Sequence, residues 1–79
     1  MDIIRWVRVE DGLYQRYVNG VPSNIYIDRV SRITASGKTR VVEGWVVCWK
    51  VPDGYESNGD YCRTLREAKR RYMDWEEVK

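Results

Sequence analysis

Histidine is absent from the 79 residues of this sequence, and only two cysteines are present. Histidine is the commonest general base and metal ligand, and it alone among side chains has an ordinary pKa near neutral pH. Cys48 and Cys62 therefore have no imidazole with which to form a thiolate pair, and two cysteines cannot complete a four-ligand zinc site. A disulfide between them can form in principle, but a cytosolic protein keeps its thiols reduced. We expect no metal site and no cofactor.

Long hydrophobic runs are missing as well. The longest uninterrupted apolar run covers residues 45–49, whereas a membrane-spanning helix needs about 18 or more apolar residues. The first residues have neither the long apolar stretch nor the small-residue cleavage site of a secretory signal. We expect a cytoplasmic protein that does not contact a membrane.

Phenylalanine is the third absence. All ten aromatic residues are tryptophan or tyrosine, and ten arginines stand against four lysines. Tryptophan, tyrosine and arginine dominate binding hot spots because they combine a large contact area with directed hydrogen bonds. The composition is equally compatible with a small core that uses tryptophan for bulk and a surface of solvated arginines.

The length and composition of the chain indicate a single globular domain covering residues 1–79. Hydrophobic residues make up 43% and charged residues 33% of the chain, which differs from the polar profile of disordered segments. A chain of this length builds one thin core, so we expect neither a large cavity nor a small-molecule ligand. The net charge of +2 is well below that of domains that bind phosphates by charge alone.

Turn signals divide the first two thirds of the chain into extended runs. They are Asp11-Gly12, Asn19-Gly20, Ser36-Gly37 and Pro52-Asp53-Gly54. The runs between them alternate or are rich in β-branched and aromatic residues, as strands are. We predict strands at residues 3–10, 13–18, 25–33 and 40–51. Residues 55–60 read as a loop, with room for a short strand at 61–63.

The hydrophobic period changes to that of a helix after Thr64. Thr64 and Glu67 match the capping box that opens a helix, and an apolar stripe follows at helical spacing. The stripe consists of Leu65, Ala68, Tyr72 and Trp75. We predict a helix over residues 65–77 packed on a sheet. The fold class is then α+β, an antiparallel β-meander of three to four strands with one C-terminal α-helix on one face.

Two features are reminiscent of active sites but do not match one. Gly37-Lys38-Thr39 resembles the end of a phosphate-binding P-loop, yet the loop's first glycine is replaced by Arg32 and a strand follows instead of a helix. We therefore predict a hairpin turn there. The acidic residues are dispersed, without the paired spacing of hydrolytic or two-metal sites. We expect no enzymatic activity.

Cations crowd the first half of the predicted helix and acids crowd its end, the reverse of what the helix dipole favours. The cations that we single out are Arg63, Arg66, Lys69 and Arg70. A surface whose charges destabilise the helix is a candidate binding site for a partner that neutralises those charges. The simpler interpretation is a solvent-exposed helix face on which Asp74 partly neutralises Arg70.

Trp45 and Trp49 lie four residues apart on one predicted strand and so share a sheet face. Two arrangements remain open. The helix can cover the opposite face, where the residues are small, which leaves the tryptophans as an open platform. Alternatively, both tryptophans lie under the helix as core.

The sheet and the helix opening Thr64-Leu65-Arg66-Glu67-Ala68-Lys69 resemble the AP2-type and integrase amino-terminal DNA-binding modules, over residues 45–72. In that family the sheet enters the major groove, and arginine and tryptophan side chains reach bases and phosphates. In size and style the chain also resembles small accessory proteins of bacteriophages and other mobile elements, many of which bind a host protein. That resemblance implies the cytoplasm of the host cell.

These observations favour a non-enzymatic binding module that engages a protein partner through an arginine, tryptophan and tyrosine surface. Interspersed acids support this hypothesis, because a protein interface tolerates both signs of charge whereas phosphates repel carboxylates. The alternative is a nucleic-acid-binding sheet module that contacts phosphates through basic residues of the helix and sheet. The predicted partner-binding residues are Arg63, Arg66, Lys69, Arg70, Trp45 and Trp49.

Overall fold

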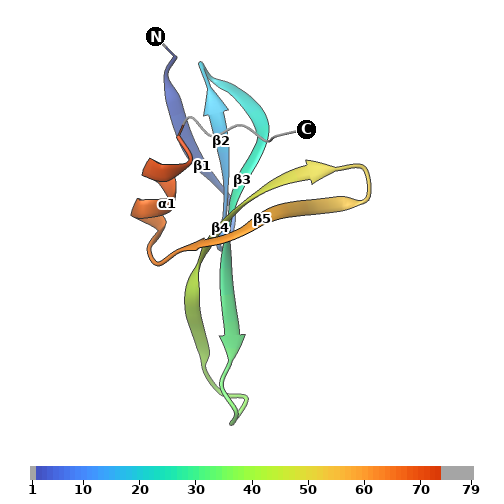
Figure 1. The fold of residues 1–79 in the computed structure, drawn as a ribbon, viewed down its shortest axis with the longest axis vertical. Coiled ribbons are helices and arrows are strands. Elements are labelled where there is room, and N and C mark those ends of the chain that lie inside the picture. The colour runs from blue at the N-terminus through green and yellow to red at the C-terminus, as the bar shows by residue number, and fades with distance from the viewer. Residues whose placement is uncertain (1, 74–79) are drawn as a thin grey trace.

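The computed structural model describes residues 2–73, with only the backbone described at positions 58 and 59. Five strands precede one helix: β1 Ile4–Glu10, β2 Leu13–Val18, β3 Val21–Ile33, β4 Arg40–Val51, β5 Gly54–Cys62 and α1 Leu65–Arg71. The strands form one antiparallel sheet in the order β1-β2-β3-β4-β5 (Figure 1). The predicted α+β class is confirmed, but the sheet has more strands than we predicted. Within the described residues no helix is long and apolar enough to cross a membrane.

Tight turns connect the first three strands. Asn19 and Gly20 both have positive φ, and Val18 pairs with Val21 across them, as in a two-residue hairpin turn. β3 begins at Val21, four residues earlier than predicted. Its Pro22 lies opposite Tyr17, where the register shifts, because a proline cannot donate a ladder hydrogen bond.

The prediction of a loop at residues 55–60 is wrong, because this segment belongs to β5. Its turn-forming residues are tolerated because β5 is an edge strand, paired only with β4 in the described sheet. β4 is rich in β-branched and aromatic residues and supplies the ladder. A register shift between Val46 and Cys48 absorbs the irregularity. Tertiary pairing thus overrides the local turn preference.

The core lies between α1 and one face of the sheet. Its buried members are Ile25, Ile27, Val47, Cys62, Ala68 and Tyr72, and Trp6, Tyr14, Trp45, Trp49 and Leu65 pack around them. Both tryptophans of β4 are therefore on the helix side, and the open-platform arrangement is wrong. The physical reason is area: covering the large indole rings removes more apolar surface from water than covering the small residues of the opposite face.

The helix is shorter than predicted. It begins after Thr64, whose hydroxyl accepts a 3.1 Å hydrogen bond from the Glu67 N–H, so the predicted cap is confirmed. It ends at Arg71, because Tyr72 has left the helical conformation with φ −102° and ψ 15°. Ala68 and Tyr72 of the predicted stripe are buried and Leu65 is half-buried. Asp74 and Trp75 lie outside the described residues.

The short helix reverses our expectation about the dipole. Glu67 lies in its first turn, and Lys69, Arg70 and Arg71 lie in its last turn, which is where the dipole favours each sign of charge. The prediction that these cations are placed unfavourably is therefore wrong for Lys69 and Arg70, whereas Arg63 still precedes the helix and Arg66 lies in its first turn. It assumed a helix reaching residue 77, in which all of these cations would have stood in the first half.

Arg16 of β2 anchors the end of this helix. The Arg16 side chain is only 8% exposed, and its Nη1 donates hydrogen bonds of 3.1 Å to the carbonyls of both Tyr72 and Met73. From β1, the Trp6 indole N–H donates to the Lys69 carbonyl at 3.2 Å. These carbonyls would otherwise lack partners within the helix. The helix is thereby joined to β1 and β2 as well as to the neighbouring β4 and β5.

Gly44 permits the close approach of β4 and β5. A Cβ atom at this position would lie 2.7 Å from the Cys62 carbonyl oxygen, closer than real contacts allow. On the other side of β4, the register with β3 shifts between Val30 and Ser31, next to Gly44. Below this point β3 and β4 continue as a separate two-stranded extension, at the bottom of Figure 1.

Replacing Arg16 tests the anchor. Arg16→Met keeps the apolar stem but removes two charge-assisted hydrogen bonds, so the free energy of unfolding should fall by about 2–4 kcal/mol in urea denaturation. The free energy of unfolding of Arg16→Lys should lie between those of the wild type and Arg16→Met, because a lysine ammonium keeps the charge but lacks the planar guanidinium that donates two hydrogen bonds. Equal midpoints for wild type and Arg16→Met would contradict this role.

Replacing Gly44 tests the close approach. In Gly44→Ala the new methyl group meets backbone rather than a flexible side chain, so β4 and β5 must separate, at a cost of about 1–3 kcal/mol. Thermal and urea unfolding measure the change. The control is Val42→Ala on the same strand, whose exposed position predicts a change within about 0.5 kcal/mol. Indistinguishable stabilities for the two variants would reject the argument.

Candidate functional site

The predicted helix cations lie on the surface. Arg63, Arg66 and Arg70 are exposed, and Lys69 is half-buried. Successive residues of a helix are rotated by about 100°, so Arg66, Lys69 and Arg70 lie on one flank, to one side of the buried Ala68. Arg63 precedes the helix and stands apart from that flank.

Lys69 brings this flank into contact with aromatic residues of the sheet. Its Nζ lies 4.7 Å from the centre of the Tyr14 ring, a cation–π distance. The Tyr14 ring in turn meets Trp45 edge to face, with 6.0 Å between ring centres. We call this group, Tyr14, Trp45, Arg66, Lys69 and Arg70, the cation–aromatic surface. The sequence prediction contained all of it except Tyr14.

Trp49 does not join this surface. It lies four residues further along β4, about 13 Å from Trp45 at the rise of a strand. There it is half-buried against the core, opposite Ile25 on β3 and Glu56 on β5. The structure therefore brings together Trp45 and Lys69 and separates Trp49 from them.

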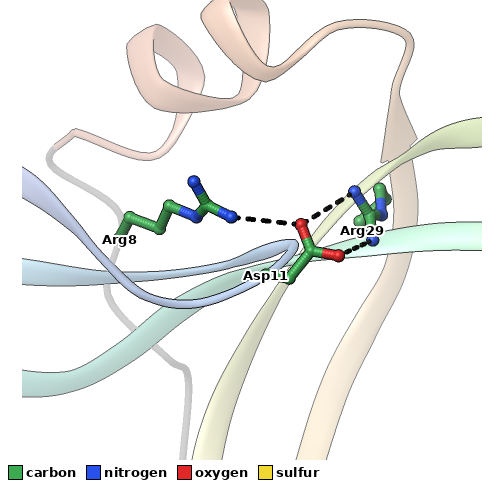
Figure 2. A network of polar contacts seen from close by, with 3 residues as sticks. All are labelled: Arg8, Asp11 and Arg29. Atoms are coloured by element: carbon green, nitrogen blue, oxygen red, sulfur yellow. Dashed lines mark hydrogen bonds and ion pairs between the residues drawn. The ribbon is translucent and has the colours of Figure 1, made fainter.

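An ion-pair network at the β1–β2 turn lies on the helix side of the sheet (Figure 2). Asp11 pairs with Arg29 at 2.9 Å and with Arg8 at 3.3 Å. The hydrogen bond and charge of Arg29 lower the pKa of the Asp11 carboxyl below its usual 3.8. Gly12 has positive φ, and a Cβ there would lie 2.9 Å from the Arg29 Nε, so glycine leaves room for the guanidinium.

The uncovered face of the sheet holds a cleft of about 410 Å³. One row of directly paired residues crosses four strands there: Glu10, Leu13, Asp28 and Val46. The register shift between Arg8 and Glu10 turns Glu10 to this face. Asp11, Cys48, Tyr55, Glu56 and Ser57 complete the lining. The lining combines the apolar Leu13 and Val46 with carboxylates, of which Asp11 is ion-paired with Arg29 and Arg8. Glu56 lines the cleft from the edge strand, although its pairing with Trp49 directs its side chain toward the helix side.

Burial is the main influence on the pKa values of groups in this cleft. Burial raises the pKa of Asp28, a backbone hydrogen bond from Arg29 and the charge of Arg29 lower it, and the charge of Glu10 raises it to a smaller extent. Burial and the charge of Asp28 together raise the pKa of the Cys48 thiol to about 11. Cys48 is therefore a neutral thiol at physiological pH and a poor nucleophile.

The two cysteines lie on opposite sides of the sheet. Cys62 pairs with Trp45 and belongs to the core under the helix, whereas Cys48 lines the cleft. Both are buried and free. The disulfide left open by the sequence is excluded here, because the sheet separates the two side chains.

Sequence reasoning missed the cleft because its acids are far apart along the chain. Glu10 and Asp28 come from two different strands, and only the pairing register brings them to one face, because both pair with Leu13. The alternation of side chains gave a partial signal, since Asp28 falls between the inward-facing Ile27 and Arg29. Among the described residues, no group of three or more histidine, cysteine or acidic side chains is placed to hold a metal ion.

Thiol alkylation tests the state of Cys48. In the folded protein, the rate of Cys48 labelling by iodoacetamide should stay low at pH 8 and rise toward pH 11, because only the thiolate reacts. Peptide mass spectrometry identifies the labelled residue, and the urea-unfolded chain, with an ordinary thiol pKa, is the control. Rapid labelling of Cys48 near pH 7 in the folded state would contradict the raised pKa.

Comparisons of this chain with models of protein families, with curated proteins and with solved structures gave no match.

Proposed function

We propose that this protein is a non-enzymatic binding module that engages a protein partner through the cation–aromatic surface, in the style of bacteriophage accessory proteins. The observation that carries the proposal is the contact of Lys69 with Tyr14 and of Tyr14 with Trp45. It joins the helix cations to half-buried rings of the sheet. Half-buried aromatic rings bordered by arginines are the chemistry of binding hot spots.

The neighbourhood of this surface suits a protein interface. Met73, 43% exposed, follows the end of the helix and adds an adaptable apolar side chain. The Trp6 indole and the Arg16 guanidinium hold the helix from below. A partner therefore meets a surface whose main features are already positioned, which reduces the entropy lost on binding.

The nucleic-acid alternative is less well supported. In the AP2-type modules that the sequence resembles, the sheet enters the major groove, and a sheet can do so only with the face its helix leaves open. In this protein that face carries Glu10 and Asp28 at the cleft. Phosphates would be repelled by these carboxylates, so binding to a protein is the better proposal.

A pull-down from lysate with and without nuclease, followed by affinity measurement with the identified protein, tests the proposal. Arg66→Glu with Arg70→Glu should weaken binding at least about tenfold, and Tyr14→Ala should cost about 2 kcal/mol or more, as central hot-spot residues do. The matched control reverses two exposed cations elsewhere, Arg5→Glu with Lys50→Glu, and should leave the affinity unchanged.

Two results would refute this function. One is retention that nuclease abolishes, with affinity that falls steeply between about 50 and 200 mM salt. The other is equal affinity for the wild type, the Arg66→Glu, Arg70→Glu variant and Tyr14→Ala, all with intact folding by circular dichroism.

A further inference from the structure

The extension of β3 and β4 is a two-stranded ribbon without neighbours in the described sheet. Pairing of β2 with β3 ends at Asp28, and pairing of β5 with β4 ends at Trp45. Residues 31–42 consequently pair only with each other, and Figure 1 shows them projecting from the body. We call residues 31–42 the β3–β4 ribbon. A two-stranded ribbon is at best marginally stable alone, so a surface that covers it would stabilise it.

The β3–β4 ribbon concentrates positive charge. It contains Arg32, Lys38 and Arg40 and no acidic residue, whereas the net charge of the whole chain is +2. Arg32 forms a 2.8 Å salt bridge with Glu43, at the base of the ribbon. Lys38 and Arg40 are exposed and form no salt bridge with the described residues.

Apolar side chains accompany this charge. Ile33 pairs with Arg40 and Ser31 pairs with Val42, which places these residues on one face of the β3–β4 ribbon. Ile33 is 56% exposed and Val42 is 47% exposed. This face therefore combines a cation with two uncovered β-branched side chains.

The tip of the ribbon is held in a defined shape. The Thr34 N–H donates to the Thr39 carbonyl and the Gly37 N–H donates to the Thr34 carbonyl, both at 2.8 Å. The hydroxyls of Thr34 and Ser36 are 3.0 Å apart. Gly37 supplies the positive φ that the turn requires. A ribbon ordered in this way loses little conformational entropy when it binds.

The cleft on the uncovered face has the complementary chemistry. Glu10 and Asp28 form no salt bridge within the described residues, whereas Asp11 in the same lining pairs with Arg29 and Arg8; Leu13 and Val46 provide apolar surface. The Tyr55 ring, 54% exposed, adds a further apolar surface. Glu10 and Asp28 lie across Leu13 from each other and repel each other, and a cation arriving between them reduces this repulsion.

We propose that the cleft of one molecule receives the β3–β4 ribbon of a second copy of this chain, with Lys38 and Arg40 against the carboxylates and Ile33 and Val42 against the apolar surface. This single contact accounts for both features, the uncovered ribbon and the Glu10 and Asp28 carboxylates that form no salt bridge within the described residues. Nucleic acid would satisfy the cations of the ribbon, but its phosphates offer no cover for the two apolar side chains.

The two surfaces are different, so the contact is heterologous, and assembly can continue from molecule to molecule or close into a ring. The average mass in solution should therefore increase with protein concentration. Salt screens charges over about 10 Å at 0.1 M, so association should weaken at high ionic strength. Sedimentation velocity and light scattering of the full chain measure both effects.

Charge reversal and rescue provide the decisive experiment. The ribbon variant Lys38→Glu, Arg40→Glu and the cleft variant Glu10→Lys, Asp28→Lys should each sediment as a monomer at concentrations where the wild type associates. All four substitutions in one chain should restore association, because the charges are again complementary. The helix variant Arg66→Glu, Arg70→Glu is the matched control and should associate as the wild type does.

Circular dichroism and urea midpoints establish that each variant folds. A wild type that stays monomeric at low salt over the accessible concentrations would overturn the proposal. The proposal would also be overturned if the ribbon and cleft substitutions, combined in one folded chain, failed to restore association. It would likewise be overturned if nuclease abolished the association, because the ribbon would then bind nucleic acid. None of these results depends on the protein partner of the cation–aromatic surface, so the two proposals fail separately.

Discussion

The hydrogen bonds from Arg16 to the carbonyls of Tyr72 and Met73 are the contact on which the arrangement of this protein depends. A helix of seven residues has little stability of its own. It stays on the sheet because Arg16 binds the negative end of its dipole and because Ala68 and Tyr72 are buried beneath it. Through this anchor, the last element of the chain stabilises the first hairpin.

The second constraint is the close approach of β4 and β5 at Gly44. It coincides with the register shift between β3 and β4, where the five-stranded body ends and the two-stranded ribbon continues. A larger residue at this point would separate the strands that carry Trp45 and Cys62. The same local geometry therefore supports the core on one face and leaves the β3–β4 ribbon projecting.

The body separates its functional chemistry by face. Cations and aromatic rings meet on the helix side, where Lys69 contacts Tyr14. Carboxylates and the weakly acidic Cys48 thiol line the cleft on the other side. A small domain has too little core for an enclosed pocket, but a twisted sheet with a helix on one face still offers a second, hollowed face. Two surfaces of opposite charge can serve two different contacts.

The sequence alone was sufficient to predict those turns, strands and caps that depend only on the preferences of a few neighbouring residues. The turns at Asp11-Gly12 and Asn19-Gly20, the apolar strand β4 and the Thr64 cap could be read from the sequence because backbone conformation and capping are local preferences. The tertiary structure decided what depends on register and on contacts between distant segments. Glu10 and Asp28 share a cleft, Trp45 lies under the helix, and residues 55–60 form a strand. In a sheet, a shift of one residue moves every side chain to the other face, and only the packing of the whole chain selects the register.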